Sequence, residues 1–236
     1  MKDRFFALTI VGGKGKRLMP LTEKKPKPLV KINGKPIIEH QINWMKSQGI
    51  TDVLFLCGYK GKLISDYFGD GRKFGINAHY SFEDKPLGRG GAIKNAINKI
   101  PKEINQFLVT NGDVLTTQSL KPILNTHNTN ASLATVMTVP YPNQYGLVEI
   151  KKNGTVHSFN EKTQIPFYIN SGIYYFEKSI HNYLPKIGDH EIFTFPDLVK
   201  KNKISGYISK SFWTSIESHK ELDEVEKKLQ SGKITF

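Results

Sequence analysis

The chain has 236 residues, 38% of them hydrophobic, which is enough for a buried core in one large or two small domains. A single cysteine, Cys57, excludes a disulfide framework and favours a reducing compartment such as the cytoplasm. The sequence shows no signal peptide and no apolar run long enough to span a membrane, so no membrane partner is expected.

The formal net charge of +13 raises the question of nucleic-acid binding, but its distribution favours a smaller anion. Residues 1–35 contain ten Lys or Arg side chains against two acidic ones, Asp3 and Glu23. A field concentrated in this way attracts polyphosphate substrates. No nucleic-acid-binding motif accompanies the charge, so we expect no nucleic-acid partner.

Five continuous apolar runs predict buried strands, and three apolar stripes predict helices. The predicted strands are Ala7–Val11, Val53–Cys57, Phe107–Thr110, Leu133–Val139 and Ile173–Phe176. Runs without alternation indicate burial on both faces, as in a parallel sheet. The predicted helices begin at Pro36 and end at Gly49, span Ala92–Ile97, and span Leu222–Leu229. This alternation predicts an α/β fold whose ligands bind at the carboxyl ends of the strands.

A glycine-rich turn, Gly12, Gly13 and Gly15, follows the first predicted strand directly. Such a turn exposes main-chain N–H groups that can wrap a phosphate chain, and Arg17 supplies charge nearby. The spacing excludes a P-loop, and the dinucleotide pattern G-x-G-x-x-G fails because Leu18 follows where glycine is required.

Asp113 closes the predicted strand Phe107–Thr110 within the sequence Asn-Gly-Asp. A carboxylate at a strand end, near a polyphosphate loop, is well placed to bind Mg²⁺, although such a sequence also favours a simple turn. Gly12, Gly58 and Asp113 all follow predicted strands, which indicates one shared site.

Several segments, taken in order, resemble the sugar-1-phosphate nucleotidyltransferase family. Residues 11–29, VGGKGKRLMPLTEKKPKPL, resemble its glycine-rich signature, with Val11 for Ala and Lys16 for Thr as departures. Glu83 and residues 86–92 resemble its nucleobase-contacting loop, in which Gly90 and Gly91 would let the backbone approach a base. Tyr145-Gly146, Glu161-Lys162 and Ile169–Tyr174 resemble segments on its acceptor side. The resemblance spans Ala7 to about Leu229.

The resemblance implies a Rossmann-like, open, mixed but mainly parallel sheet flanked by helices. It implies a single domain over 1–236, with a nucleotide-binding half at about 1–139, a sugar-phosphate-binding half at about 140–236, and no β-helix tail. The implied catalytic residues are Arg17, Lys27, Asp113 and Lys162. The implied nucleotide-binding residues are Gly12, Gly13, Gly15, Glu83 and Gly88, and the implied sugar-phosphate-binding residues are Gly146, Glu161, Lys162 and Asn170.

Three departures from the family pattern concern the site. Arg89 replaces a threonine, Thr163 replaces the proline after Glu-Lys, and Ser215 replaces the aspartate that is the second metal ligand. Glu217, two residues after Ser215, either completes the Mg²⁺ site with Asp113 or simply begins the last helix, where acidic residues are favoured.

The implied reaction transfers a nucleoside monophosphate from an NTP to a sugar 1-phosphate and releases pyrophosphate. Glu83 favours GTP, because a carboxylate can accept hydrogen bonds from two donors of guanine. We therefore expect a guanylyltransferase acting on a mannose- or heptose-type 1-phosphate. Uridylyl-, thymidylyl- and cytidylyl-transferases, including one with a phosphocholine acceptor, remain alternatives, as does a non-catalytic nucleotide-binding regulator. A homo-oligomer is compatible with the family.

Overall fold

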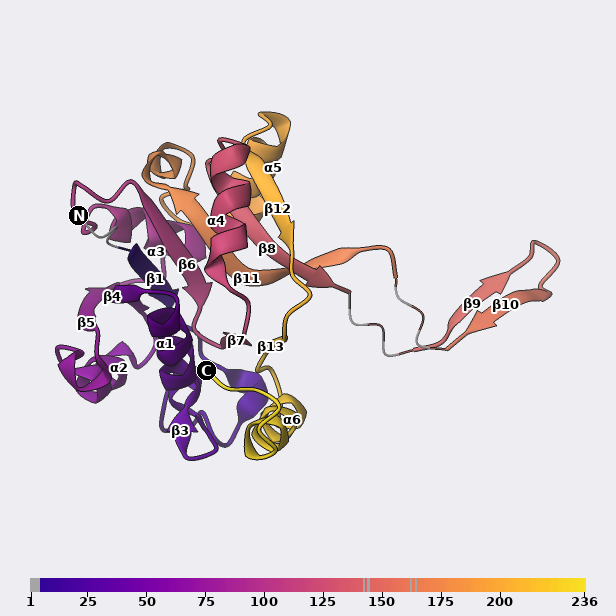
Figure 1. The fold of residues 1–236 in the computed structure, drawn as a ribbon, viewed down its shortest axis with the longest axis horizontal. Coiled ribbons are helices and arrows are strands. Elements are labelled where there is room, and N and C mark those ends of the chain that lie inside the picture. Colours follow the sequence, from indigo (N-terminus) through magenta and orange to yellow (C-terminus); the bar gives the residue numbers. More distant parts are fainter. Residues whose placement is uncertain (1–4, 142, 144, 162, 164) are drawn as a thin grey trace.

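A seven-stranded sheet forms the centre of the computed structural model, which describes residues 5–141, 143, 145–161, 163 and 165–236 (Figure 1). Its strand order is β12-β8-β11-β6-β1-β4-β5. All five predicted strands are confirmed within it. The strands are β1 (Phe5–Ile10), β4 (Ile50–Cys57), β5 (Asn77–Phe82), β6 (Gln106–Asn111), β8 (Ala134–Pro140), β11 (Tyr168–Glu177) and β12 (Ile204–Ile208).

The sheet is mixed but mainly parallel, as predicted. Strands β6, β1, β4 and β5 run parallel to one another, and β12 is parallel to β8. Strand β11 is antiparallel to both of its neighbours, β6 and β8. Residues 171–176 of β11 are nevertheless buried in succession. The continuous apolar run therefore reports burial on both faces of the strand, not its direction.

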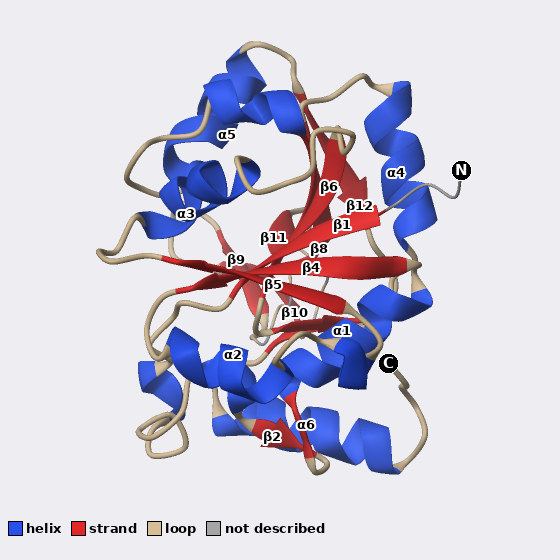
Figure 2. Ribbon diagram, turned by 90° about the vertical axis from the view of Figure 1, so that its left-hand side faces the viewer, coloured by secondary structure: helices blue, strands red, loops and turns tan. Residues whose placement is uncertain are grey.

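Helices cover both faces of the sheet (Figure 2). One face packs against α1 (Ile37–Ser47), α2 (Gly61–Phe68) and α4 (Leu120–Thr129), and the other against α3 (Gly88–Ile97) and α5 (His190–Lys200). The predicted limits of the first helix are confirmed, since α1 starts after Pro36 and stops before Gly49, which has φ +83°. No helix within the described ranges is both long and apolar enough to cross a membrane.

A third core lies where the C-terminal helix α6 (His219–Gln230) meets the segments that follow β1. Its buried side chains include Leu18, Val30, Leu115, Ile216 and Leu222. This core fixes the segments that bring Arg17, Lys27 and Glu217 to the sheet edge. The remaining short elements are η1 (Lys16–Leu18), η2 (Lys27–Leu29), β2 (Lys31–Ile32), β3 (Lys35–Pro36), η3 (Arg72–Phe74), β7 (Val114–Thr116), η4 (Lys178–Asn182) and β13 (Trp213–Ser215).

A β-hairpin made of β9 (Leu147–Ile150) and β10 (Val156–Asn160) projects from the body as an arm (Figure 1). Four apolar side chains face each other in two cross-strand pairs, Ile150 with Val156 and Val148 with Phe159. All four are exposed. The arm connects β8 to β11, so its base lies at the edge of the sheet next to β13.

His190, the first residue of α5, is fully buried among aromatic rings. Its ring centroid lies 5.1 Å from that of Tyr174 and 5.0 Å from that of Phe195, both edge-on. Neither ring nitrogen has a hydrogen-bond partner among the described residues. Burial lowers the pKa of His190 to about 4, although the neighbouring Glu191 opposes this shift. The imidazole is therefore neutral in the folded protein at neutral pH.

We predict that His190 makes the protein less stable in mild acid. The unfolded chain binds a proton near pH 6.5 and the folded chain only near pH 4, so stability falls as the pH drops between these values. The whole loss is on the order of 3 kcal/mol. Urea unfolding of His190→Leu at pH 7 and pH 5 should show a smaller fall than in the wild type. The exposed His157→Leu serves as the control, and a fall in His190→Leu as large as that in the wild type would contradict this assignment.

Candidate active site

The turn after β1 contains three glycines, and the surroundings of the three differ. A β-carbon at Gly12 would lie 3.1 Å from the nitrogen of Gly58, at the end of β4. Gly15 has φ +60°, and a β-carbon there would lie 2.9 Å from Cβ of Lys27. Gly13 has neither constraint, because a β-carbon there would meet no heavy atom within 4 Å. The space beside Gly13 is therefore open to a ligand.

Two carboxylates converge on the ammonium group of Lys27. Its Nζ lies 2.7 Å from Oδ2 of Asp113 and 3.1 Å from Oε2 of Glu217. The Lys27 side chain is only 9% exposed, so the three charges are largely shielded from solvent on the lysine side. Arg17 approaches Oε2 of Glu217 to 2.5 Å from the solvent side. The structure thus brings four of the predicted site residues to one point.

Backbone pairing fixes the positions of both carboxylates. Strand β7, which follows Asp113, pairs antiparallel with β13, and Ser215 lies opposite Val114. The Ile216 N–H then donates to the Asp113 carbonyl oxygen over 3.0 Å. Asp113 and Glu217 are therefore held on adjacent segments by main-chain hydrogen bonds, with little dependence on their own side-chain conformations.

Glu217 does not begin the last helix, so that interpretation is wrong. Helix α6 starts at His219, after its N-cap residue Ser218. The main-chain N–H of Ser218 donates to the Glu221 carboxylate over 2.7 Å, forming a capping box. Glu221 therefore serves the helix terminus, and Glu217 is left to the pocket. The hydroxyl of Ser215 donates to Oε1 of Glu217 over 3.2 Å.

Asp113 and Glu217 are suitable ligands for a Mg²⁺ ion. This ion takes one or two carboxylates and completes its coordination with water and phosphate oxygens. No group of three or more His, Cys, Asp or Glu side chains suited to a metal occurs in the part of the chain that the structure describes. The pair fits a metal ion whose remaining ligands are water and phosphate oxygens.

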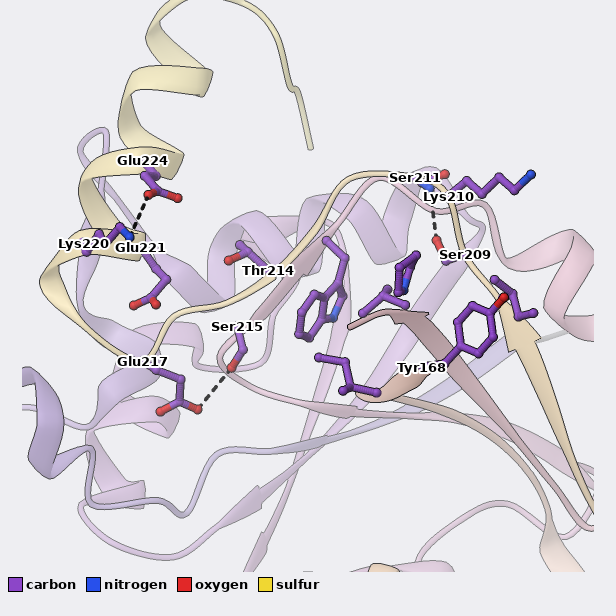
Figure 3. Close-up of a pocket in the computed structure, with 15 residues that line it drawn as sticks. Tyr168, Ser209, Lys210, Ser211, Thr214, Ser215, Glu217, Lys220, Glu221 and Glu224 are labelled. Carbon is purple, nitrogen blue, oxygen red and sulfur yellow. Dashed lines mark hydrogen bonds and ion pairs between the residues drawn. The ribbon is translucent and has the colours of Figure 1, made fainter. Parts of the chain in front are cut away.

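Three adjoining cavities meet at Glu217. The first, of about 460 Å³, lies at the carboxyl ends of β1, β4 and β6 and contains most of the predicted nucleotide site. A second, of about 220 Å³, contains Gly15 and Arg17. A third, of about 750 Å³, runs between the base of the arm and α6, with Glu217 and Ser215 at one end and Tyr168 at the other (Figure 3). Predicted residues in the first cavity are Gly12, Gly13, Lys27, Glu83, Gly88, Asp113 and Glu217.

The glycines of the predicted base-binding segment have a structural role. A β-carbon at Gly90 would lie 2.7 Å from the His190 nitrogen, and one at Gly91 would lie 2.5 Å from the Lys186 carbonyl oxygen. Gly88, with φ +72°, lies against Gly188 in the same way. The close approach expected for a base at Gly90 and Gly91 is thus made by the protein's own backbone.

Glu83 is held facing the first cavity from the end of β5. Its Oε2 accepts a hydrogen bond from the Leu87 N–H over 3.1 Å. Its Oε1 lies beside the backbone of Gly58, where a β-carbon would be only 2.8 Å from it. The carboxylate is therefore oriented by the same loop whose residue Gly88 lines the cavity.

The predicted acceptor residues are not brought together with Asp113. Gly146 and Glu161 lie side by side at the base of the arm, where a β-carbon at Gly146 would be 2.8 Å from Oε2 of Glu161. Neither lines the first cavity, because the hairpin that carries them extends away from the body (Figure 1). Lys162 lies outside the described residues, and its predicted role stays a prediction.

Sequence reasoning missed two features of the site. Asn111 lines the first cavity, and its Oδ1 is buried without a hydrogen-bond partner among the described residues. Arg89 lines the same cavity and pairs with Asp189 and Glu191, about one hundred residues away. The departure from the family pattern at Arg89 was visible in the sequence, but its partners were not.

Comparison with known proteins gives a consistent result. The model of the family described as Nucleotidyl transferase matches residues 6–232. A mannose-1-phosphate guanylyltransferase from Mycobacterium tuberculosis is 34% identical over 88% of this chain, which spans 59% of that protein. A D-glycero-alpha-D-manno-heptose 1-phosphate guanylyltransferase from Aneurinibacillus thermoaerophilus is 33% identical over 95% of this chain and 98% of its own length.

The fold has a solved counterpart in HddC from Yersinia pseudotuberculosis complexed with GMP-PN. That structure has a TM-score of 0.75 at 27% sequence identity, and the match covers 95% of this chain and 99% of that one. The family match covers nearly the whole chain and includes every segment that builds the three cavities. This chain therefore belongs to the nucleotidyl transferase family.

Proposed function

We propose that this protein transfers a guanylyl group from GTP to a mannose- or heptose-type sugar 1-phosphate, releasing pyrophosphate. The observation that carries the proposal is the nearly buried Lys27 ammonium between Asp113 and Glu217, beside the open face of Gly13. Such a site can bind a polyphosphate and balance its charge. The guanylyltransferase relatives, one of which matches almost end to end, support the choice of reaction.

The proposed reaction needs positioning and charge neutralisation more than covalent chemistry. An oxygen of the sugar phosphate attacks the α-phosphorus of GTP, and the bond from the α-phosphorus to the bridging oxygen breaks. The Gly13 turn and Arg17 bind the departing pyrophosphate, while Lys27 neutralises charge on the α-phosphate. When bound by Asp113 and Glu217, Mg²⁺ supplies further positive charge to the phosphate oxygens.

The choice of guanine rests on Glu83. Its carboxylate, oriented by the Leu87 N–H, retains acceptor capacity for the ring N–H and the amino group of guanine. Uracil and thymine offer only one ring N–H at the equivalent edge. The GMP-PN complex of HddC, a protein of the same fold, further supports a guanine nucleotide.

The acceptor is proposed to bind beside Glu217, where the first cavity adjoins the third cavity. The strand ends that line this cavity lead directly into the arm that carries Gly146 and Glu161. For Glu161 to contact the acceptor, the arm has to approach the body. Movement of this kind over a bound substrate is common in transferases.

The direct test is Mg²⁺-dependent release of pyrophosphate from five NTPs, each paired with mannose, heptose, glucose and other sugar 1-phosphates and with phosphocholine. We expect release with GTP and a mannose- or heptose-type acceptor. Release confined to another NTP and acceptor would identify that pair as the substrates, in place of GTP and a mannose- or heptose-type 1-phosphate. If GTP binds without any release in the matrix, the protein is a nucleotide-binding regulator and the proposal fails.

We predict that Gly13→Ala weakens nucleotide binding without destabilising the fold. A methyl group at Gly13 meets no protein atom within 4 Å, but it occupies the space assigned to the phosphates. The dissociation constant for GTP, measured by calorimetry, should rise at least about tenfold, as expected for the loss of a charge-assisted hydrogen bond. Gly206→Ala in β12, which also has open space, is the control. Unchanged affinity in Gly13→Ala would place the phosphates elsewhere.

We predict that the carboxylate of Glu217 can be moved to position 215. Glu217→Gln should raise the Mg²⁺ concentration needed for half-maximal activity and lower kcat by tenfold or more, by analogy with other charge-stabilising groups. The double variant Ser215→Asp/Glu217→Gln should recover part of the loss, since the two side chains share the same wall of the site. Wild-type Mg²⁺ dependence in Glu217→Gln would show that Glu217 serves only the ion pair with Arg17.

A further inference from the structure

An ion-pair network made by Arg89, Asp189 and Glu191 adjoins the first cavity, which Arg89 and Asp189 line. Arg89 Nη2 lies 3.0 Å from Oδ2 of Asp189 and 2.5 Å from Oε2 of Glu191. The main-chain N–H of Arg89 donates to Oδ1 of Asp189 over 2.9 Å. Asp189 therefore binds Arg89 through both of its oxygens. The guanidinium in turn lowers the pKa of Asp189, which keeps that carboxyl ionised.

The same network satisfies the first turn of α3. The N–H groups of Gly90 and Gly91 donate to the Gly188 carbonyl oxygen over 2.9 and 3.2 Å, next to the bond from the Arg89 N–H. These donors are thus used by protein. The start of α3 contributes Gly88, Arg89 and Ala92 to the cavity lining, and among these Arg89 supplies the charged side chain.

Asn170, a predicted sugar ligand, is already engaged in this network. Its Nδ2 donates to Oε1 of Glu191 over 2.8 Å and to the Tyr174 hydroxyl over 2.9 Å, while its Oδ1 accepts from the Gly172 N–H. The buried Tyr174 hydroxyl also donates to Oε1 of Glu191 over 2.6 Å. Asn170 therefore orients Glu191 and has no amide proton left for a sugar hydroxyl.

Arg89 retains unused donors. Within the described residues its side-chain hydrogen bonds and ion pairs involve Nη2, and Nε and Nη1 have no protein partner. The side chain is 35% exposed and lines the first cavity together with Asp189. Donors on the guanidinium and the carboxylate oxygens of Asp189 thus lie side by side at the cavity wall, an arrangement that matches neighbouring hydroxyl groups, while Glu191 holds the guanidinium from behind.

The order of the strands separates the Glu191 end of this network from Glu83. Glu83 follows β5 and lies against Gly58, which follows β4, whereas Asp113 follows β6 in the middle of the sheet. Glu191 contacts Asn170 and Tyr174 of β11, which lies on the far side of β6 from β1, whereas Arg89 belongs to α3, which packs against β1 and β4. A nucleotide with its base at Glu83 and its phosphates at Lys27 leaves the part of the cavity beside Arg89 and Asp189 to the second substrate.

We propose that Arg89 and Asp189, with Glu191 holding the Arg89 guanidinium in place, recognise the hydroxyl groups of the acceptor sugar and make Arg89 a determinant of acceptor specificity. This inference rests on the proposed transferase function. One guanidinium and two carboxylates carry a net charge of −1, so the cluster selects a neutral, hydroxyl-rich sugar and disfavours a sugar that carries a carboxylate. The threonine found here in the family pattern cannot bridge two carboxylates, so this recognition belongs to chains with the arginine.

The test compares Arg89→Thr and Arg89→Lys with the wild type, using GTP and the 1-phosphates of mannose, heptose, glucose and glucuronic acid. We expect Arg89→Thr to raise KM for the preferred neutral acceptor about tenfold or more, with KM for GTP within about twofold. Arg89→Lys should recover part of the loss. Glu191→Gln should improve the relative use of glucuronic acid 1-phosphate. Arg72→Thr, which breaks an exposed pair with Asp70, is the matched control.

The outcomes separate this inference from the function on which it rests. A wild-type protein inactive with every acceptor overturns both. An active wild type whose acceptor preferences and KM values are unchanged in Arg89→Thr overturns the role of Arg89 alone. Equal losses for GTP and all acceptors, with a lowered unfolding temperature, would also overturn it, because Arg89 would then serve only to join α3 to α5.

Discussion

The arrangement of the site depends on one electrostatic constraint, the neutralisation of two carboxylates that the fold holds close together. Asp113 and Glu217 are fixed on adjacent segments by the bond from Ile216 N–H to the Asp113 carbonyl oxygen. Their charges repel one another at short range unless a cation lies between them. Lys27 supplies that cation from a nearly buried position, and Arg17 adds a second positive charge from the solvent side. A bound metal ion and a polyphosphate can replace these contacts with equivalent ones.

The rest of the fold supports this cluster. The third core joins Leu18 of η1, Val30 directly after η2, Ile216 shortly before α6 and Leu222 within it, so that Arg17, Lys27 and Glu217 lie on segments packed against one another. The glycine turn contributes differently at each position: Gly12 permits close packing on Gly58, Gly15 permits a left-handed backbone, and Gly13 leaves space for the ligand. The parallel strands β1, β4 and β6 end at the same edge, which brings these segments into one cavity.

Much of this arrangement could be predicted from local sequence, because strand ends and glycine turns have local signatures. The strand at Ala7–Val11 and the helix after Pro36 follow from patterns of a few residues, whereas the sequence left Glu217 open between the pocket and the start of the last helix. The pairing of Arg89 with Asp189 and Glu191 could not be predicted, since it depends on how α3 packs against α5. The same packing explains why glycine occupies positions 90 and 91, where a β-carbon would collide with the backbone of residues 186–190. The direction of the arm is likewise a property of tertiary structure, and it separates Gly146 and Glu161 from Asp113.

The central claim is that Glu217 takes the place of the carboxylate absent at Ser215 as a partner of Asp113 in binding a cation. The most direct measurement is anomalous diffraction from crystals grown with Mn²⁺ and a non-hydrolysable GTP analogue. We predict a metal peak within bonding distance of carboxylate oxygens from both Asp113 and Glu217, at the position where Lys27 now bridges them. A peak bound by Asp113 alone, with Glu217 still paired to Arg17, would contradict the account.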